Sequence, residues 1–387
     1  MFNLDFRLPE ELEMLQKTIR RFVEKECLEL EQHLCNTDPD WVELPKEEHE
    51  RIANKLKENG LWALSTPADL GGGGVGPLGM VVAQEEKSKT TIGTAHHSPF
   101  GGEPPGILYN AKGDQVEKYL LPMIRGEIRA AMANTEPGAG SDAAAIQTTA
   151  VKKGDKWVIN GTKLFSTLAD KADFLFVTAV TDKEKRGRGG ITMFLVDADT
   201  PGFTVNRKVP VIRPQYSTEL YFDNVEVPES QILGEVGQGF HLFKEWAAYG
   251  RIRMAATCLG MAQRALDMSI QHAKHRETFG KQLATRQAVQ WMLVDSAVEI
   301  KTARLLTYET AWRLERGEDV LEEASMCKLY GTEMAFRVLD RAIQIHGGMG
   351  LTKELPLERW FRDIRVMRIV EGATEIQKFI IARKMLR

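Results

Sequence analysis

The sequence predicts an α+β protein with helices at both ends and a β-rich region between them. Apolar residues recur at three- and four-residue steps early in the chain and again from Gly239 onward, which is the period of an amphipathic helix. Between 126 and 232 the pattern changes to short β-rich runs separated by glycine pairs and a Pro-Gly turn. We therefore expect an N-terminal helical domain over 1–125, a central antiparallel β domain over 126–232 and a C-terminal helical domain over 233–387.

The first region begins with a helical pattern over 12–22 and continues with a second over 52–61, which has a stop signal at Asn59-Gly60. The glycines over 74–79 have the spacing of a dinucleotide-binding loop. Such a loop follows a strand, whereas the sequence before this one is helical, so we expect a loop between helices.

The middle region contains four β-rich runs, over 156–159, 174–177, 191–196 and 219–222. Helical periodicity then returns in three long segments, over 254–274, 287–316 and 324–346. This separation of helices from strands is typical of an α+β architecture rather than of alternating βα units.

Composition excludes several classes of function. The 387 residues include 51 Lys and Arg against 54 Asp and Glu, so binding to nucleic acid or to an anionic membrane is not expected. No apolar run reaches the roughly 18 residues of a membrane span. The start of the chain lacks the pattern of a targeting signal, and the four cysteines lack metal-binding spacing, so we expect a cytoplasmic protein without a metal.

Three glycine-containing loops are candidates for binding. The loop over 134–142 combines small residues with hydroxyl and carboxylate groups, and it suits either a planar ring or phosphate, or an ordinary turn between strands. Glycines also follow helical segments at 276–281 and 344–350, beside Arg, Gln and His. Exposed backbone N–H groups and such donors suit a pyrophosphate and an adenine.

Five motifs in order, at 135–142, 260–267, 276–281, 344–350 and 371–377, make nearly the whole chain resemble the acyl-CoA dehydrogenase family. The resemblance implies a C-terminal four-helix bundle and a homodimer or homotetramer. It also implies a non-covalent FAD, an acyl-CoA substrate of fatty acid or lipid metabolism, and an electron-transferring flavoprotein as partner.

The resemblance assigns residues to the cofactor. Residues implied to line the isoalloxazine ring are Met132, Thr135, Phe165 and Thr167. Residues implied to hold the ADP part across a dimer interface are Arg276, Thr278, Phe279 and Gln287, with Gln344, Gly347 and Gly348 from the neighbouring subunit. Further implied FAD contacts are Thr374 and Glu375. Phe165 stands where many relatives have tryptophan, and its ring can still cover one flavin edge.

By the same resemblance, Glu371 removes the α-proton of the acyl-CoA while the β-hydrogen leaves as hydride to flavin N5, which yields the trans-2-enoyl-CoA. Some relatives place the base immediately before the arginine that matches Arg251, but that position is Gly250 here. Residues implied to contact the substrate are Ser141, Tyr249, Arg251 and Gly372.

The identity of the substrate's acyl group stays open. Ala248 replaces an aspartate that many members carry near the CoA arm, and the loop over 95–107 is rich in polar and rigid residues. That loop suits a polar or cyclic acyl group or reflects surface histidines. Two other functions also stay open: an acyl-CoA oxidase that uses oxygen, and a non-catalytic assembly protein on the same scaffold.

Overall fold

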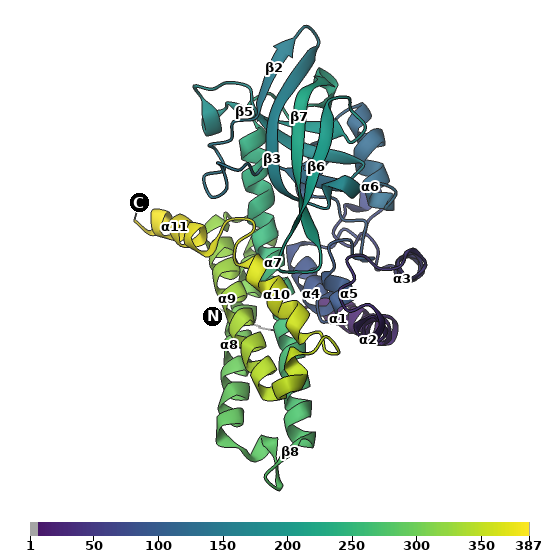
Figure 1. Cartoon of the computed structure of the whole chain (residues 1–387), viewed down its shortest axis with the longest axis vertical. Helices are drawn as coiled ribbons and strands as arrows, with labels where there is room; N and C mark the ends of the chain where they lie inside the picture. The colour runs from purple at the N-terminus through teal and green to yellow at the C-terminus, as the bar shows by residue number, and fades with distance from the viewer. Residues whose placement is uncertain (1–6, 387) are drawn as a thin grey trace. The chain divides into compact units, whose positions relative to one another are not determined.

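The computed structural model describes residues 7–386, which divide into two compact units (Figure 1). One unit joins the two ends of the chain, up to Phe100 and from Gly250 onward, and is mainly helical. The other, Gly101–Tyr249, contains the large sheet. The predicted α+β class is therefore confirmed, and the predicted domain boundaries at 125 and 232 remain predictions.

The N-terminal part of the helical unit contains α1 (Glu10–Phe22), α2 (Leu28–Thr37), α3 (Lys46–Glu58), α4 (Pro77–Lys87) and α5 (Thr91–Thr94). A π-helical turn, Val23–Cys27, joins α1 to α2. Asn59 follows the last residue of α3, and Gly60 takes a φ of 66°, as the predicted stop signal requires. The glycine stretch at 74–79 enters α4 directly with no strand before it, so it lacks the context of a dinucleotide loop.

The C-terminal part contains α7 (Gly239–His275), α8 (Gln287–Glu315), α9 (Leu321–His346), α10 (Leu357–Met367) and α11 (Thr374–Met385). α7 begins in the sheet-containing unit, and its residues from Gly250 onward belong to the helical unit. α9 packs against α8, α10 and α11, while α4 packs against α1 and α8 (Figure 1). The bundle core includes Leu259, Leu339 and Trp360, all fully buried.

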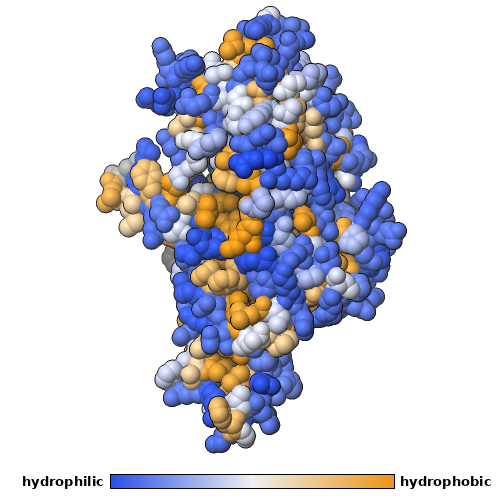
Figure 2. Space-filling view, viewed as in Figure 1, coloured by the Kyte–Doolittle hydropathy of each residue, from blue (hydrophilic) through white to orange (hydrophobic). Residues whose placement is uncertain are grey.

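The surface of the helical unit is not uniformly polar. Figure 2 shows hydrophobic residues that interrupt its hydrophilic surface. The large exposed apolar or aromatic side chains of α8 are Trp291, Val294, Val298, Leu305 and Trp312. Steps of three, four and seven residues place them along one face of the helix.

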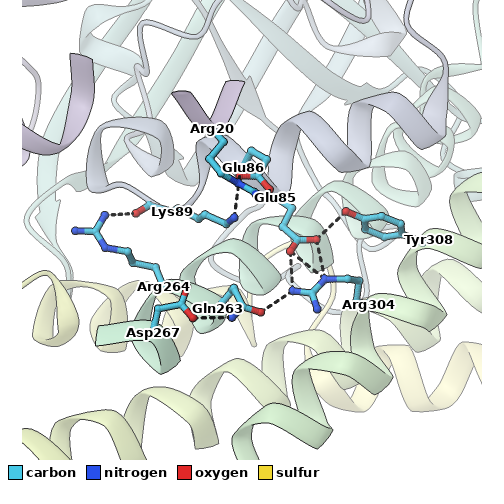
Figure 3. Close-up of polar contacts among 9 residues, drawn as sticks. All are labelled: Arg20, Glu85, Glu86, Lys89, Gln263, Arg264, Asp267, Arg304 and Tyr308. Atoms are coloured by element: carbon cyan, nitrogen blue, oxygen red, sulfur yellow. Dashed lines mark hydrogen bonds and ion pairs between the residues drawn. The ribbon is translucent and has the colours of Figure 1, made fainter. Parts of the chain in front are cut away.

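Buried ion pairs tie α4 to α1 and α8 (Figure 3). Glu85 accepts hydrogen bonds from Arg304 Nη2 and Tyr308 Oη at 2.7 and 2.8 Å. Glu86 accepts one from Arg20 Nη2 at 2.7 Å. Because both glutamates are at most 3% exposed, these partners offset the loss of their hydration.

The sheet-containing unit has seven strands: β1 (Ala130–Ala133), β2 (Thr149–Lys153), β3 (Lys156–Thr167), β4 (Phe174–Val180), β5 (Ile191–Asp197), β6 (Phe203–Pro210) and β7 (Tyr216–Pro228). A short helix, α6 (Leu121–Arg125), precedes β1. The strand order is β1-β4-β2-β3-β7-β6, and β5 also pairs with β4. The pairs are antiparallel except that β4 runs parallel to β1 and β2, which the sequence pattern did not indicate. The four predicted runs lie in β3, β4, β5 and β7.

A bulge in β3 positions one of the predicted site residues. The β3–β7 register shifts between Lys163, which faces Leu220, and Ser166, which faces Thr218. One extra residue in β3 is accommodated there, and Phe165 takes a φ of 61°. Its ring is 56% exposed although it belongs to an inner strand. The bulge therefore turns this aromatic side chain toward the surface of the unit.

Within 7–386, no helix is both long and apolar enough to cross a membrane. The same stretch contains no group of three or more His, Cys, Asp or Glu side chains arranged to hold a metal ion.

Candidate active site

Glu371 lies in a tight turn between α10 and α11. Glu371 and Gly372 both take left-handed conformations, with φ values of 55° and 89°. A positive φ is uncommon for glutamate and requires support from its surroundings. Gln377 Nε2 donates to the Gly372 carbonyl at 2.7 Å, and Thr374 N donates to the Arg368 carbonyl at 3.1 Å. These bonds hold the turn in its strained shape.

The carboxylate of Glu371 is in an unusual environment. The residue as a whole is half-buried, but its Oε2 atom is buried and has no hydrogen-bond partner among the described residues. Burial raises the pKa of the Glu371 carboxyl, while the positive charges of Lys328, Arg253 and Arg251 act to lower it. A raised pKa makes this group a stronger proton acceptor than an ordinary surface glutamate.

Gly250 faces this carboxylate from α7. A Cβ atom built at Gly250 would lie far inside van der Waals contact with Glu371 Oε2. Any side chain at 250 would therefore displace the carboxylate. Gly250, which offers no carboxylate as an alternative base, is also what leaves room for Glu371.

The predicted substrate residues divide between the two units. Arg251 is 7% exposed and donates to Ser325 Oγ at 3.3 Å, and its Nε has no partner among the described residues. Arg251 and Gly372 belong to the helical unit together with Glu371. Ser141, which is exposed, and Tyr249, which is half-buried, belong to the sheet-containing unit.

A buried ion pair stabilises the loop over 134–142. Lys163 Nζ lies 2.9 Å from Glu136 Oε1 and donates to the Asn134 carbonyl at 3.0 Å. Glu136 also accepts the backbone N–H groups of Gln147 and Thr148 at 2.6 and 2.9 Å. Burial acts to raise the pKa of Glu136, but the Lys163 charge and the hydrogen bonds lower it below its usual range. These contacts therefore fix the conformation of the loop at Asn134 and Glu136.

The structure brings the predicted flavin-ring residues together on neighbouring segments. Leu164 N donates to the Thr135 carbonyl at 2.8 Å, which joins the end of β1 to the bulge of β3. Met132, Thr135 and Thr167 are half-buried there, and Phe165 is exposed. A Cβ at Gly138 or Gly140 would meet nothing within 4 Å. Open backbone, hydroxyl groups and an exposed aromatic ring fit the edge of a planar ring system such as a flavin.

The predicted ADP-binding residues form two exposed groups in the helical unit. Phe279 and Gly280 make the two-residue turn between β8 (Glu277–Thr278) and β9 (Lys281–Gln282), with φ values of 52° and 67°. Phe279 is 97% exposed. The other exposed residues of this group are Arg276 and Gln287, and Thr278 is half-buried. Donors and an aromatic ring at the surface fit an adenosine diphosphate.

The second group lies at the end of α9. Gln344, Gly347 and Gly348 are exposed, and neither glycine has any atom within 4 Å of a built Cβ. No hydrogen bond among the described residues joins this group to Arg276, Thr278, Phe279 or Gln287. At the start of α11, Thr374 Oγ1 donates to Glu333 at 3.1 Å, and Glu375 is exposed.

Sequence reasoning missed three charged residues near the predicted sites: Lys163, Arg253 and Lys328. Lys328 had a detectable signal, because it shares a helix face with the small residues Ala324, Gly331 and Ala335 at steps of four, three and seven. A single lysine on such a face indicates a buried charge. Sequence reasoning also missed a depression of about 430 Å³, which His272, His346 and Met349 help to line. Glu371 is not among the residues that line it.

Comparison with known proteins gives a consistent result over the whole chain. Family models match the N-terminal, middle and C-terminal domains of acyl-CoA dehydrogenases over 9–127, 131–225 and 237–386. The (R)-benzylsuccinyl-CoA dehydrogenase of Thauera aromatica is 41% identical over 99% of this chain and 97% of its own length. The subunit CarC of the caffeyl-CoA reductase-Etf complex of Acetobacterium woodii is 36% identical over 98% of this chain and 99% of its own length.

Solved structures agree. The FAD complex of PigA has a TM-score of 0.89 and 27% identity, and the match covers 99% of each chain. The resemblance found in the motifs is thereby confirmed across both the helical and the sheet-containing unit, together with the expected enzyme class and cofactor. The chain belongs to the acyl-CoA dehydrogenase family of FAD-dependent oxidoreductases.

Proposed function

We propose that this protein converts an acyl-CoA thioester to its trans-2-enoyl-CoA, with Glu371 as the base that takes the α-proton. The observation that carries this proposal is the buried Glu371 Oε2, which has no hydrogen-bond partner among the described residues. A buried carboxylate oxygen without a hydrogen-bond partner costs free energy unless a ligand or a proton binds to it. The substrate's α-proton supplies that partner.

The residues around Glu371 support proton removal. Gly250 leaves room for the carboxylate to reach a substrate carbon. Burial raises the pKa of Glu371 toward the working pH, where a general base is most effective. The backbone N–H of Glu371 donates to the thioester oxygen, on which negative charge develops as the proton leaves. FAD bound at this site would supply the hydride acceptor for the β-hydrogen.

In this proposal, several groups of residues hold FAD. Met132, Thr135, Phe165 and Thr167 contact the ring, while the Lys163–Glu136 pair keeps the loop over 134–142 in shape. Residues proposed to bind the ADP part are Arg276, Thr278, Phe279, Gln287, Gln344, Gly347, Gly348, Thr374 and Glu375. Substrate contacts are proposed at Ser141, Tyr249, Arg251 and Gly372.

The protein is proposed to work as a homodimer or homotetramer. The α8 face formed by Trp291, Val294, Val298, Leu305 and Trp312 is exposed and apolar, as expected of a surface that a second copy covers. The residues proposed to bind the ADP part come from two segments, at β8–β9 and at the end of α9, and a cofactor shared between two subunits is part of this proposal. Light scattering that shows a stable flavin-bound monomer would contradict this part.

An electron-transferring flavoprotein is the proposed acceptor. CarC, a relative of this chain, belongs by its name to an Etf complex, and this supports the proposal. Rapid formation of hydrogen peroxide in place of flavoprotein reduction would favour the oxidase alternative. Flavin bleaching by any acyl-CoA would exclude a purely non-catalytic assembly protein. The test panel should include straight, branched, cyclic, aryl and dicarboxylic acyl-CoAs.

Substitution Glu371→Gln tests the base directly. The amide keeps the shape of the carboxyl but takes no proton, so acyl-CoA and FAD should still bind. Flavin reduction in a single turnover should fall by roughly 100-fold to 10,000-fold. Glu354→Gln, at an exposed glutamate of the same unit, is the matched control and should react normally. Near-normal reduction by the Glu371→Gln variant would mean that another group is the base.

A further inference from the structure

Lys328 is a buried charge without an assigned role. It lies on α9, is 1% exposed and shares its helix face with buried Ala324, Gly331 and Ala335. An ammonium group in such a place loses most of its hydration, so the fold must supply compensation. Both hydrogen bonds of Lys328 Nζ among the described residues go to one short segment of chain.

That segment is the turn that carries Glu371. Lys328 Nζ donates to the Val370 carbonyl at 2.6 Å and also to the Gly372 carbonyl. The two carbonyls flank Glu371 on either side. Since a positive φ is strained for Glu371, although not for Gly372, the turn needs such anchors. Gln377 provides a second anchor at the Gly372 carbonyl, 2.7 Å away.

We infer that Lys328 is a positioning residue for the reaction: its ammonium fixes the Glu371 turn and places a positive charge behind the carboxylate, which keeps the base ionised. This inference rests on the proposed role of Glu371. The hydrogen bonds satisfy the ammonium without neutralising its charge, because carbonyl oxygens carry no net charge. That charge therefore acts on the nearby carboxylate.

The surrounding charges are consistent with this role. Burial lowers the pKa of Lys328 to about 8, while the negative charge of Glu371 acts to raise it and the positive charge of Arg251 acts to lower it. From α7, the charge of Arg253 also acts to lower the pKa of Glu371, and Cys258 stays a neutral thiol because burial raises its pKa to about 12. Arg368, in the same turn, is paired with Glu333 of α9 at 2.8 Å. Lys328 is thus protonated near neutral pH and loses its proton as the pH passes about 8.

The pH profile of single-turnover flavin reduction tests the inference. In the wild-type holoenzyme the rate should rise as Glu371 ionises and fall above about pH 8 as Lys328 loses its proton. In Lys328→Met the rising limb should move up by about one pH unit, and the fall at high pH should disappear. Lys328→Arg should keep the rising limb in place and also remove the fall, because arginine stays charged. Lys46→Met, at an exposed lysine of α3, is the matched control.

A second measurement needs no turnover. An infrared titration of the Glu371 carboxyl, identified as the band lost in Glu371→Gln, should show the same upward shift in Lys328→Met. Lys328→Gln, which is smaller and still donates one hydrogen bond, replaces the Met variant if the latter does not fold. A lower rate with an unmoved pH midpoint in either neutral variant would overturn the inference. That result is distinct from failure of the proposed function. The proposed function would fail if the Glu371→Gln variant remained active.

Discussion

Two buried lysines, one in each unit, occupy similar environments but have different partners. Lys163 of β3 and Lys328 of α9 are at most 1% exposed, and burial lowers the pKa of each to about 8. Lys163 forms an ion pair with Glu136 at 2.9 Å beneath the loop over 134–142. Lys328 instead donates to the carbonyls of Val370 and Gly372 around the Glu371 turn.

The difference teaches how a buried cation can serve either structure or reactivity. Glu136 cancels the charge of Lys163 locally, so this pair acts chiefly as a brace for the loop. No carboxylate is hydrogen-bonded to Lys328 among the described residues. The positive charge of Lys328 therefore acts on Glu371 and lowers the pKa of its carboxyl. Both lysines support strained or open backbone, but only one also acts on a titrating group that is proposed to react.

The largest effect is expected from Lys163→Met. The substitution leaves Glu136 charged and buried without its cation, which typically costs about 3 to 5 kcal/mol. The free energy of unfolding, measured with urea, should fall by that amount, and FAD should be retained poorly. Lys156→Met is the control on the same strand, because its ion pair with Glu226 is exposed and screened by solvent, so its loss should cost much less. An equal loss of unfolding free energy in both variants would mean that the buried Lys163–Glu136 pair stabilises the protein no more than an exposed ion pair.

The double variant Lys163→Met, Glu136→Gln sharpens the same point. The amide oxygen still accepts the backbone N–H groups of Gln147 and Thr148, but no charge is left unpaired. The double variant should therefore be more stable than the sum of its single variants predicts, by about 0.5 to 3 kcal/mol. A urea-unfolding cycle over the four proteins measures this coupling, and simple additivity would show that the pair is not coupled.

Gly250→Ala should separate reactivity from stability near Glu371. The added methyl group displaces the carboxylate, which lies at the end of a flexible side chain. We expect flavin reduction to slow by roughly 10-fold to 100-fold, because a small misplacement of a reacting group is costly. Alanine is a better helix former than glycine by about 1 kcal/mol, so unfolding should be no easier. A large loss of stability would mean that the helix, rather than the base, is disturbed.

The smallest effect concerns stability at high pH. A lysine whose pKa is about 8 when folded, against 10.5 for an ordinary solvated lysine, binds fewer protons in the folded state than in the unfolded state between these values. Stability from this group therefore rises with pH across that window and is lost as the pH falls through 8, with a slope of up to about 1.4 kcal/mol per pH unit. Urea unfolding of Lys328→Met between pH 8 and 10 should show a shallower rise than the wild type. An unchanged slope would indicate that Lys328 is not buried as a cation.

The sequence by itself determined the α+β class, most of the long helices and the residues of the motif-bearing loops. These features depend on local periodicity, on stop signals such as Asn59-Gly60, and on short motifs such as 371–377, all of which a single stretch of chain contains. The roles of Glu371 and of the FAD-binding residues came from resemblance and remain proposals. The strands β1, β2 and β6 were not indicated, and β1 consists of alanines and one methionine, which have little preference for a strand.

Only the tertiary structure decided which distant residues meet. Gly250 faces Glu371, Lys328 reaches the same turn from α9, and Lys163 of β3 meets Glu136 of the loop over 134–142. No local pattern encodes these contacts, because each joins segments far apart in the chain and depends on how whole helices and strands pack. The same packing removes water from the lysines and from Glu371, and this loss of hydration is what shifts their pKa values.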